Sequence, residues 1–128
     1  MSVYSDLIKK LDEVFSKYIR QKYAGPTGRV ACFTCGNTYH WKEIHCGHFI
    51  RRDCMPARWS EVNCKPQCEH CNCDLEGNLG MFELKLKYEL HHGEFKALES
   101  LRHQLAKFAR YELEEMIDKY NSLLKWKK

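Results

Sequence analysis

Long hydrophobic runs are missing from this sequence, and so are internal repeats and low-complexity tracts. No apolar stretch approaches the roughly 20 residues that a membrane-spanning helix needs, so we expect no membrane partner. The first ten residues lack the apolar core and the cleavage site of a secretion signal. We therefore expect a cytoplasmic protein. Charge of neither sign dominates, because the formal net charge is +4, which is compatible with a polyanionic partner without indicating one.

The composition is that of a folded protein. Hydrophobic residues make up 44% of the 128 positions and aromatic residues 12%, so wholesale disorder is excluded. This length favours one domain that can bury an apolar core. We predict a single domain over residues 1–128.

Three segments are expected along the chain. Residues 1–24 form an N-terminal helix, because apolar residues recur every three or four positions before Gly25 and Pro26 end the pattern. Residues 29–78 form a central cysteine-rich core, and residues 79–128 form C-terminal helices. The fold class is therefore α+β.

Within the core we predict a small ββα unit. Its two longer strands are expected at residues 43–50 and 58–65, after a short strand at residues 30–32. A short helix is expected to begin near Cys68 and to end at Gly77. Such a unit has little room for an apolar core, so bound metal is expected to contribute on the order of 10 kcal/mol to its stability.

Four cysteines have the spacing of a zinc site. Cys32 and Cys35 form one CxxC pair, and Cys68 and Cys71 form a second pair after a gap of 32 residues. Without an export signal, this pattern favours a structural Zn²⁺ over disulfides. Four thiolates close the coordination shell, so these residues are not expected to be catalytic. The remaining cysteines form no further CxxC pair and are interpreted as free thiols, although the spacing alone leaves Cys46 or Cys73 as competing zinc ligands; they are Cys46, Cys54, Cys64 and Cys73.

Two histidines and an asparagine near the zinc pairs could do chemistry. His45 and His48 lie at the end of a predicted strand, and Asn72 directly follows the last cysteine of the zinc set. A neutral imidazole binds a divalent ion or accepts a proton from water, and an amide oxygen suits Mg²⁺ or Mn²⁺. Phosphodiester hydrolysis needs both a base and a cation.

These residues carry a family resemblance. His45, Gly47 and His48 are followed by Arg58-Trp59, Asn63, Gln67-Cys68-x-x-Cys71-Asn72 and Gly77-Asn78. This spaced set, over roughly residues 29–92, resembles the phage NinG (Rap) recombination proteins of the HNH, or His-Me finger, nucleases. It is also similar to phage endonuclease VII, a Holliday-junction resolvase. The resemblance implies a ββα-metal core and, if a phage encodes the chain, the cytoplasm of the host cell.

The resemblance also implies a role for each residue. His48 falls on the general base that activates water, and Asn63 on the position that braces the loop and orients this histidine. Asn72 falls on a ligand of the catalytic divalent ion, Mg²⁺ or Mn²⁺. His45 replaces the aspartate usual at its position, and its nitrogen shifts metal preference toward Mn²⁺, Ni²⁺ or Zn²⁺.

Three arginines are candidate DNA contacts, because guanidinium groups bind phosphate in a bidentate manner. Arg51 and Arg52 are equally well explained as solvated loop residues, whereas Arg58 lies inside the motif. Trp59 is expected in the core.

The leading hypothesis is thus a metal-dependent endonuclease whose partner is branched DNA, such as Holliday junctions or D-loops. The helices outside the core could form a homodimer or pack on the core itself. One alternative is a zinc-stapled nucleic-acid-binding module without catalysis, which does not predict the combination of His45, His48, Asn63 and Asn72. Another is a less selective HNH nicking nuclease.

Overall fold

The computed structural model describes residues 2–127. Helices and strands are both present, so the α+β class is confirmed. The elements, in chain order, are α1 (Val3–Lys22), β1 (Arg29–Ala31), β2 (Thr38–His40), β3 (His45–His48), α2 (Met55–Arg58), η1 (Glu61–Asn63), β4 (Cys64–Gln67), η2 (His70–Asp74), α3 (Leu79–Glu89), α4 (His92–Ser100), η3 (Leu101–His103) and α5 (Arg110–Ser122).

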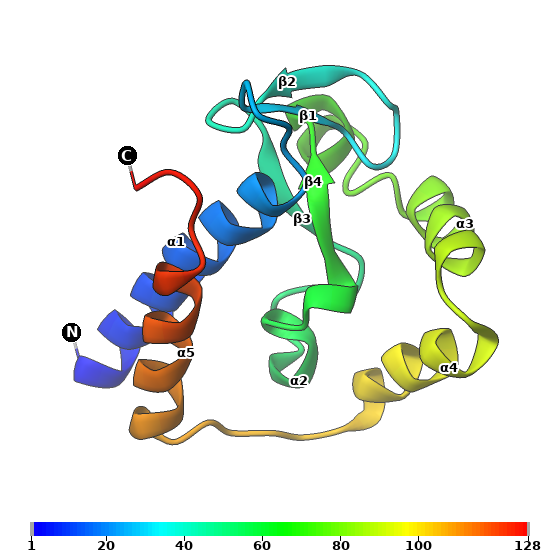
Figure 1. The fold of residues 1–128 in the computed structure, drawn as a ribbon. Coiled ribbons are helices and arrows are strands. Elements are labelled where there is room, and N and C mark those ends of the chain that lie inside the picture. The colour runs from blue at the N-terminus through cyan, green and yellow to red at the C-terminus, as the bar shows by residue number, and fades with distance from the viewer. Residues whose placement is uncertain (1, 128) are drawn as a thin grey trace.

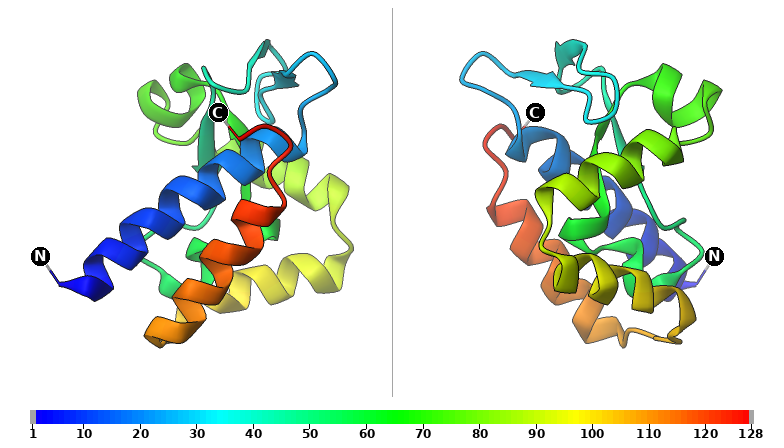
Figure 2. Two further views of the ribbon diagram at one scale, coloured as in Figure 1. Left: turned by 60° about the vertical axis from the view of Figure 1, so that its left-hand side comes forward. Right: turned by 90° about the vertical axis from the view of Figure 1, so that its right-hand side faces the viewer.

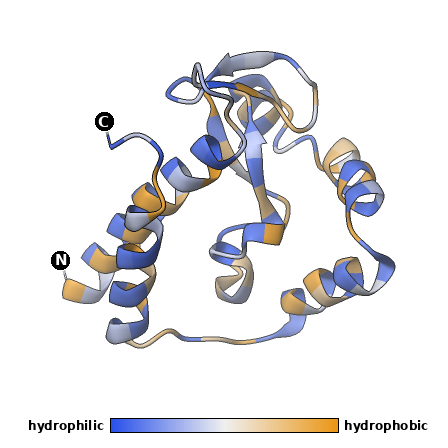
Figure 3. Cartoon of the chain, viewed as in Figure 1, coloured by the Kyte–Doolittle hydropathy of each residue, from blue (hydrophilic) through white to orange (hydrophobic). Residues whose placement is uncertain are grey.

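Helix α1 lies within the segment predicted as the N-terminal helix. The Ser2 hydroxyl accepts a hydrogen bond from the backbone N–H of Ser5 at 3.1 Å and so caps its first turn. Its apolar face is buried at Leu11, Val14, Phe15 and Ile19. Figure 3 shows hydrophobic residues interspersed with hydrophilic ones along this helix, as expected for an element that is covered on one side only.

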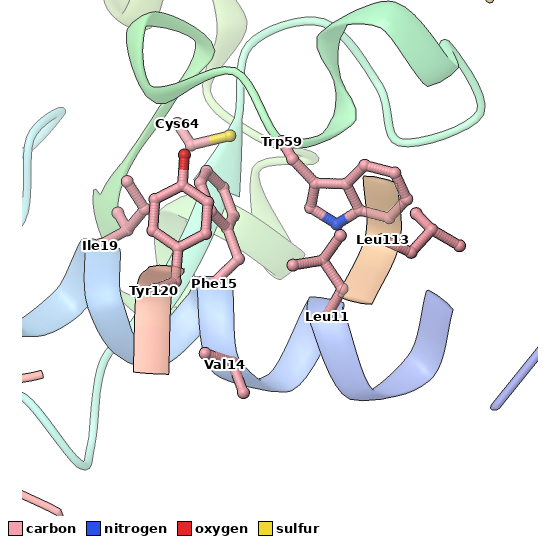
Figure 4. Close-up of a cluster of buried hydrophobic side chains, with 8 residues drawn as sticks. All are labelled: Leu11, Val14, Phe15, Ile19, Trp59, Cys64, Leu113 and Tyr120. Atoms are coloured by element: carbon pink, nitrogen blue, oxygen red, sulfur yellow. The ribbon is translucent and has the colours of Figure 1, made fainter. Parts of the chain in front are cut away.

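Helix α5 lies along α1, although the two are far apart in sequence (Figures 1 and 2). Leu113 and Tyr120 of α5 join Phe15 and Trp59 in one buried cluster, shown in Figure 4. The rings of Phe15 and Tyr120 meet edge to face with centroids 5.0 Å apart. Trp59 is 6% exposed, so its predicted place in the core is confirmed. The apolar stripe of α1 therefore packs against other segments of the same chain.

Two antiparallel two-stranded sheets form the centre. β1 pairs with β2, and β3 pairs with β4 so that His45 lies opposite Gln67 and His48 lies opposite Cys64. β3 falls inside the predicted strand at residues 43–50. The strand predicted at residues 58–65 was largely misplaced, because β4 begins at Cys64.

The misplaced segment is helical for a local reason. Pro56 sits in the first turn of α2, where its missing N–H and fixed φ favour a helix start. The side chain of Asn63, fully buried, then donates to the carbonyls of Ile50 and Ala57 and accepts from the N–H of Ile50. These bonds hold residues 50–63 in a compact loop, so the strand pairs only beyond Asn63.

Helices α3 and α4 cover another part of the core. Phe82 and Leu86 of α3 and Phe95 and Leu98 of α4 pack around Phe49. Helices were predicted here, but α4 ends at Ser100 and the chain from Gln104 to Ala109 is extended toward α5 (Figure 1). The helical structure therefore stops short of Leu105, whose side chain is fully exposed. No helix among residues 2–127 is long and apolar enough to cross a membrane.

The α1–α5 core makes a stability prediction. Leu11→Ala removes a fully buried side chain and should lower the free energy of unfolding by about 2–5 kcal/mol. The matched control Leu105→Ala alters an exposed leucine and should stay within about 0.5 kcal/mol of the parent. Urea denaturation of both variants measures the difference, and equal losses would contradict this assignment of the core.

Candidate functional site

The two CxxC pairs come together in space. Cys32 and Cys35 follow β1, Cys68 directly follows β4, and Cys71 lies in η2. Their four sulfur atoms all lie within 4.8 Å of one another, and Sγ of Cys35 is 3.8 Å from Sγ of Cys68. Zinc–sulfur bonds of about 2.3 Å in a tetrahedron place neighbouring sulfurs about 3.8 Å apart. The cluster therefore fits a structural metal such as Zn²⁺.

Hydrogen-bond donors surround these sulfurs. The backbone N–H of Cys68 donates to Sγ of Cys32 at 3.3 Å, and the N–H of Cys71 donates to Sγ of Cys68 at 3.4 Å. Burial raises the pKa of Cys32, but bonds from Thr34 and from backbone N–H groups outweigh it and bring this pKa down to about 6. These bonds favour the thiolate of Cys32, which is the form that binds metal, whereas burial raises the pKa of Cys35 and of Cys68.

The other four cysteines stand apart from this cluster. Within residues 2–127 the group of sulfurs that fits a tetrahedral site contains neither Cys46 nor Cys73, and all eight cysteines are free thiols. The competing ligand sets that the spacing left open are therefore not formed. Sγ of Cys73 instead lies 3.9 Å from Nδ1 of His45.

A cavity of about 670 Å³ lies beside the four-cysteine cluster. α1, β3, the loop that follows β3 and the turn around η2 form its walls. Both charged and neutral polar side chains face it. The residues that line it are Asp12, Phe15, Ser16, Cys46, His48, Arg51, Arg52, Asp53, Asn72, Glu76, Gly77 and Leu79.

His48 is held in one orientation at the end of β3. Its Nε2 lies 2.9 Å from the carbonyl oxygen of Arg58. A carbonyl only accepts, so Nε2 carries the proton and Nδ1 keeps its lone pair. Burial lowers the pKa of His48, and the charge of Arg52 lowers it further, against opposing contributions from the Arg58 carbonyl and Asp12. His48 is therefore neutral at physiological pH.

His45 and His48 do not point the same way. Successive side chains of a strand alternate between its faces, so two residues three apart lie on opposite faces. His48 lines the cavity, whereas Nδ1 of His45 lies 3.2 Å from Nδ2 of Asn72. Asn72 also lines the cavity. Asn72 thus contacts His45 and lines the same cavity as His48.

Position 47, between the two histidines, must be glycine because a neighbouring side chain leaves no room for a Cβ. A Cβ at this position would overlap the side chain of Gln67 on β4. Gln67 is fully buried, and its amide donates to the hydroxyl of Thr34 and to the carbonyl of Gly77. It therefore ties the first CxxC segment to the turn that follows η2.

The three arginines divide into two kinds. Arg51 and Arg52 line the cavity and are exposed. Arg58 is mostly buried and engages Asp12 of α1 through two nitrogens, Nε at 3.1 Å and Nη2 at 2.6 Å. Its Nη1 donates to the carbonyl of Arg52. A phosphate at Arg58 would have to compete with this ion pair.

Asp12 is the residue that sequence reasoning missed. It also accepts a hydrogen bond from the indole N–H of Trp59 at 2.9 Å, and it lines the cavity beside His48. The available signal was weak: a carboxylate next to Leu11, at the edge of the apolar stripe of α1. Asp12 makes α1 a wall of the site.

Comparison with known families shows which family the chain belongs to. The family model of the bacteriophage lambda NinG protein matches residues 2–128. The chain belongs to the NinG family. The match covers the zinc cluster, the cavity and the flanking helices, and so extends beyond the segment that carried the resemblance in sequence. No curated protein and no solved structure matches the chain at a significant level.

The zinc cluster makes a prediction about folding. Cys68→Ser removes one of four ligands, so metal should be lost and residues 29–78 should lose hydrogen-exchange protection, because metal binding supplies much of their stability. The control Cys54→Ser alters a half-buried thiol outside the cluster and should keep both metal and protection. Retention of one tightly bound zinc per chain with unchanged protection in Cys68→Ser would exclude the four-cysteine site.

Proposed function

We propose that this protein is a metal-dependent, structure-selective endonuclease that hydrolyses phosphodiester bonds in branched DNA such as Holliday junctions and D-loops. The observation that carries the proposal is the shared cavity: an oriented, neutral His48 lines it together with Asn72, Arg51 and Arg52. A proton acceptor, an amide next to an imidazole, and two exposed cations are the groups that phosphodiester hydrolysis needs, although Nη1 of Arg52 also lies 3.7 Å from a carboxylate oxygen of Asp12.

His48 acts as the general base. Its Nε2 is occupied by the Arg58 carbonyl, so Nδ1 accepts the proton of the attacking water. Asn63 acts as a positioning residue: it pins the loop from Ile50 to Ala57, and its own carbonyl accepts from the N–H of Phe49, next to His48.

Asn72 and His45 hold the catalytic divalent ion. The two side-chain nitrogens lie 3.2 Å apart, and a flip of the amide would place its oxygen there instead. Two neighbouring ligands of an octahedral ion with bonds of about 2.1 Å lie about 3.0 Å apart, so the pair fits such an ion. When bound, the ion stabilises charge on the phosphate and the leaving oxygen. The imidazole favours Mn²⁺ over Mg²⁺.

The order of elements supports membership of the HNH, or His-Me finger, nucleases. The hairpin of β3 and β4 is followed at once by the short helical turn η2, with His48 on the first strand and Asn72 in the turn. The insertion of α2 and η1 between the strands makes this ββα arrangement irregular. The resemblance to endonuclease VII, with CxxC pairs around the site, supports the same reading.

Arg51 and Arg52 contact the DNA backbone. Both are exposed at the cavity, and guanidinium groups bind phosphate oxygens in a bidentate manner. Selectivity for branched DNA rests on the family resemblance. A homodimer would suit a four-way junction, because two scissile strands related by symmetry would meet two sites.

The first test is cleavage of a synthetic four-way junction and of a linear duplex of the same sequence, with Mg²⁺ or Mn²⁺ and with EDTA. The junction should be cut preferentially and EDTA should stop the reaction. If neither Mg²⁺ nor Mn²⁺ supports cleavage, the alternative remains, a zinc-stapled binding module without catalysis. Equal cutting of both substrates would favour the alternative of a less selective nicking nuclease.

In the same assay His48→Ala should lower the cleavage rate by about 10²–10⁴-fold, because it removes the general base. The control His103→Ala alters an exposed histidine outside the cavity and should cleave normally. Circular dichroism and DNA affinity check that His48→Ala still folds and binds. A folded His48→Ala variant with full activity would exclude the proposed base.

The lowered pKa of His48 predicts the pH dependence. The neutral imidazole is the active form, so the cleavage rate should be full above this pKa and lost as pH falls through it, with a midpoint below 6.5. Arg52→Gln removes a charge that lowers this pKa, so the midpoint should rise toward 6.5. Arg51→Gln removes an equal charge that is not among the main causes of this shift, and its midpoint should move less. A midpoint that moves equally in both variants, or downward in Arg52→Gln, would refute this explanation.

A further inference from the structure

Three side chains that bind soft metals meet under the cavity, apart from the four-cysteine cluster. The pairing of β3 with β4 places His48 directly opposite Cys64, and Cys46 lies two residues before His48 on the same face of the strand. The ligand atoms of all three lie within 4.8 Å of one another. Cys46 and His48 line the cavity, and Cys64 lies fully buried beneath them.

The donor set has a definite metal preference. Two sulfurs and one imidazole nitrogen suit Zn²⁺ and other thiophilic ions, and they do not suit Mg²⁺. Three protein ligands leave a fourth position, which the cavity can supply with water. The Arg58 carbonyl at Nε2 of His48 is the outer partner that metal-binding histidines usually have, and it leaves Nδ1 for the ion.

The simpler reading is that Cys64 only fills space. It packs in the cluster of Phe15 and Tyr120 (Figure 4), as buried cysteines commonly do. That reading does not account for Cys46, which lines the cavity within reach of both Cys64 and His48.

We infer that Cys46, His48 and Cys64 form a second metal site, for a thiophilic divalent ion such as Zn²⁺, and that its occupation switches off the nuclease. Binding breaks two S–H bonds, forms two metal–sulfur bonds and one metal–nitrogen bond, and releases two protons to solvent. The metal takes the lone pair with which His48 accepts the proton of water. The inhibitory effect rests on the proposed function, whereas the metal site itself does not.

The metal site is tested by titrating zinc-loaded protein with Co²⁺ under a non-thiol reductant and following the thiolate-to-cobalt absorption band. The parent protein should bind one further ion. Cys46→Ala and Cys64→Ala should weaken this binding by more than the about 10–100-fold that loss of an outer partner costs. Cys46→Ala changes the cavity wall rather than the core, so it remains informative if Cys64→Ala fails to fold.

Two controls isolate the site. Cys54→Ala removes a half-buried thiol elsewhere, and His45→Ala removes the imidazole near Cys73; both should bind the further ion as the parent does. Any exchange of Co²⁺ for zinc at the four-cysteine cluster would add the same absorption to the parent and to every variant, so it would not affect the comparison. Equal binding by the parent and by Cys46→Ala, or no further ion at all, would overturn the site.

The inhibitory effect is tested in the Mn²⁺-dependent junction assay with added Zn²⁺. Activity of the parent should fall in step with occupation of the second site, and Cys46→Ala should keep its own starting activity over the same range. A second ion that binds without lowering activity would overturn the switch and leave the site standing. If the protein cuts no DNA in any divalent ion, the proposed function fails, and the Co²⁺ titration still decides the site.

Discussion

The register between β3 and β4 is the constraint on which the rest of the structure depends. It places His48 opposite Cys64 and His45 opposite Gln67, and it brings Cys68 next to the first CxxC pair at the far end of the hairpin. A slip of one residue would exchange the two faces of the strand. The imidazole of His48 would then leave the cavity, and Gly47, the residue that leaves room for Gln67, would no longer face it. A metal ion held by the four cysteines at the end of this hairpin would therefore do more than add local stability, because it would select one pairing.

Helix α1 has a second role besides covering the core. Asp12 holds Arg58 and Trp59, and the backbone of Arg58 in turn holds the ring of His48. The orientation of the histidine is thus set through a chain of contacts that begins on a helix outside the predicted nuclease core. Bidentate ion pairs with limited exposure keep such geometry better than solvated ones do.

Patterns with a strong periodicity or spacing were predictable from the sequence. The 3.6-residue repeat of Leu11 and Phe15 defined α1, and the double CxxC spacing defined the four-cysteine cluster, because both depend on neighbours in sequence. The start of β4 was not predictable, since the side chain of Asn63 bonds to Ile50 and Ala57 and outweighs the strand propensity of the segment. Asp12 and the meeting of Cys46 with Cys64 depend on contacts between distant segments, which no local pattern encodes. The roles of His45, Asn63 and Asn72 came from the family resemblance and stay predictions.

The packing of α5 against α1 has a consequence for the order in which this protein assembles on the ribosome. The apolar face of α1 is synthesised early, yet part of its cover, Leu113 and Tyr120, arrives much later. Gln21 of α1 also finds its partners only in a late segment, since its side chain forms hydrogen bonds with the backbone of Lys125 and Trp126. Contacts between such distant segments form late in folding, and until then the part of the apolar face that α5 covers stays exposed to solvent and to chaperones. The helix that carries Asp12, a wall of the cavity, is therefore fully covered only after α5 has been synthesised.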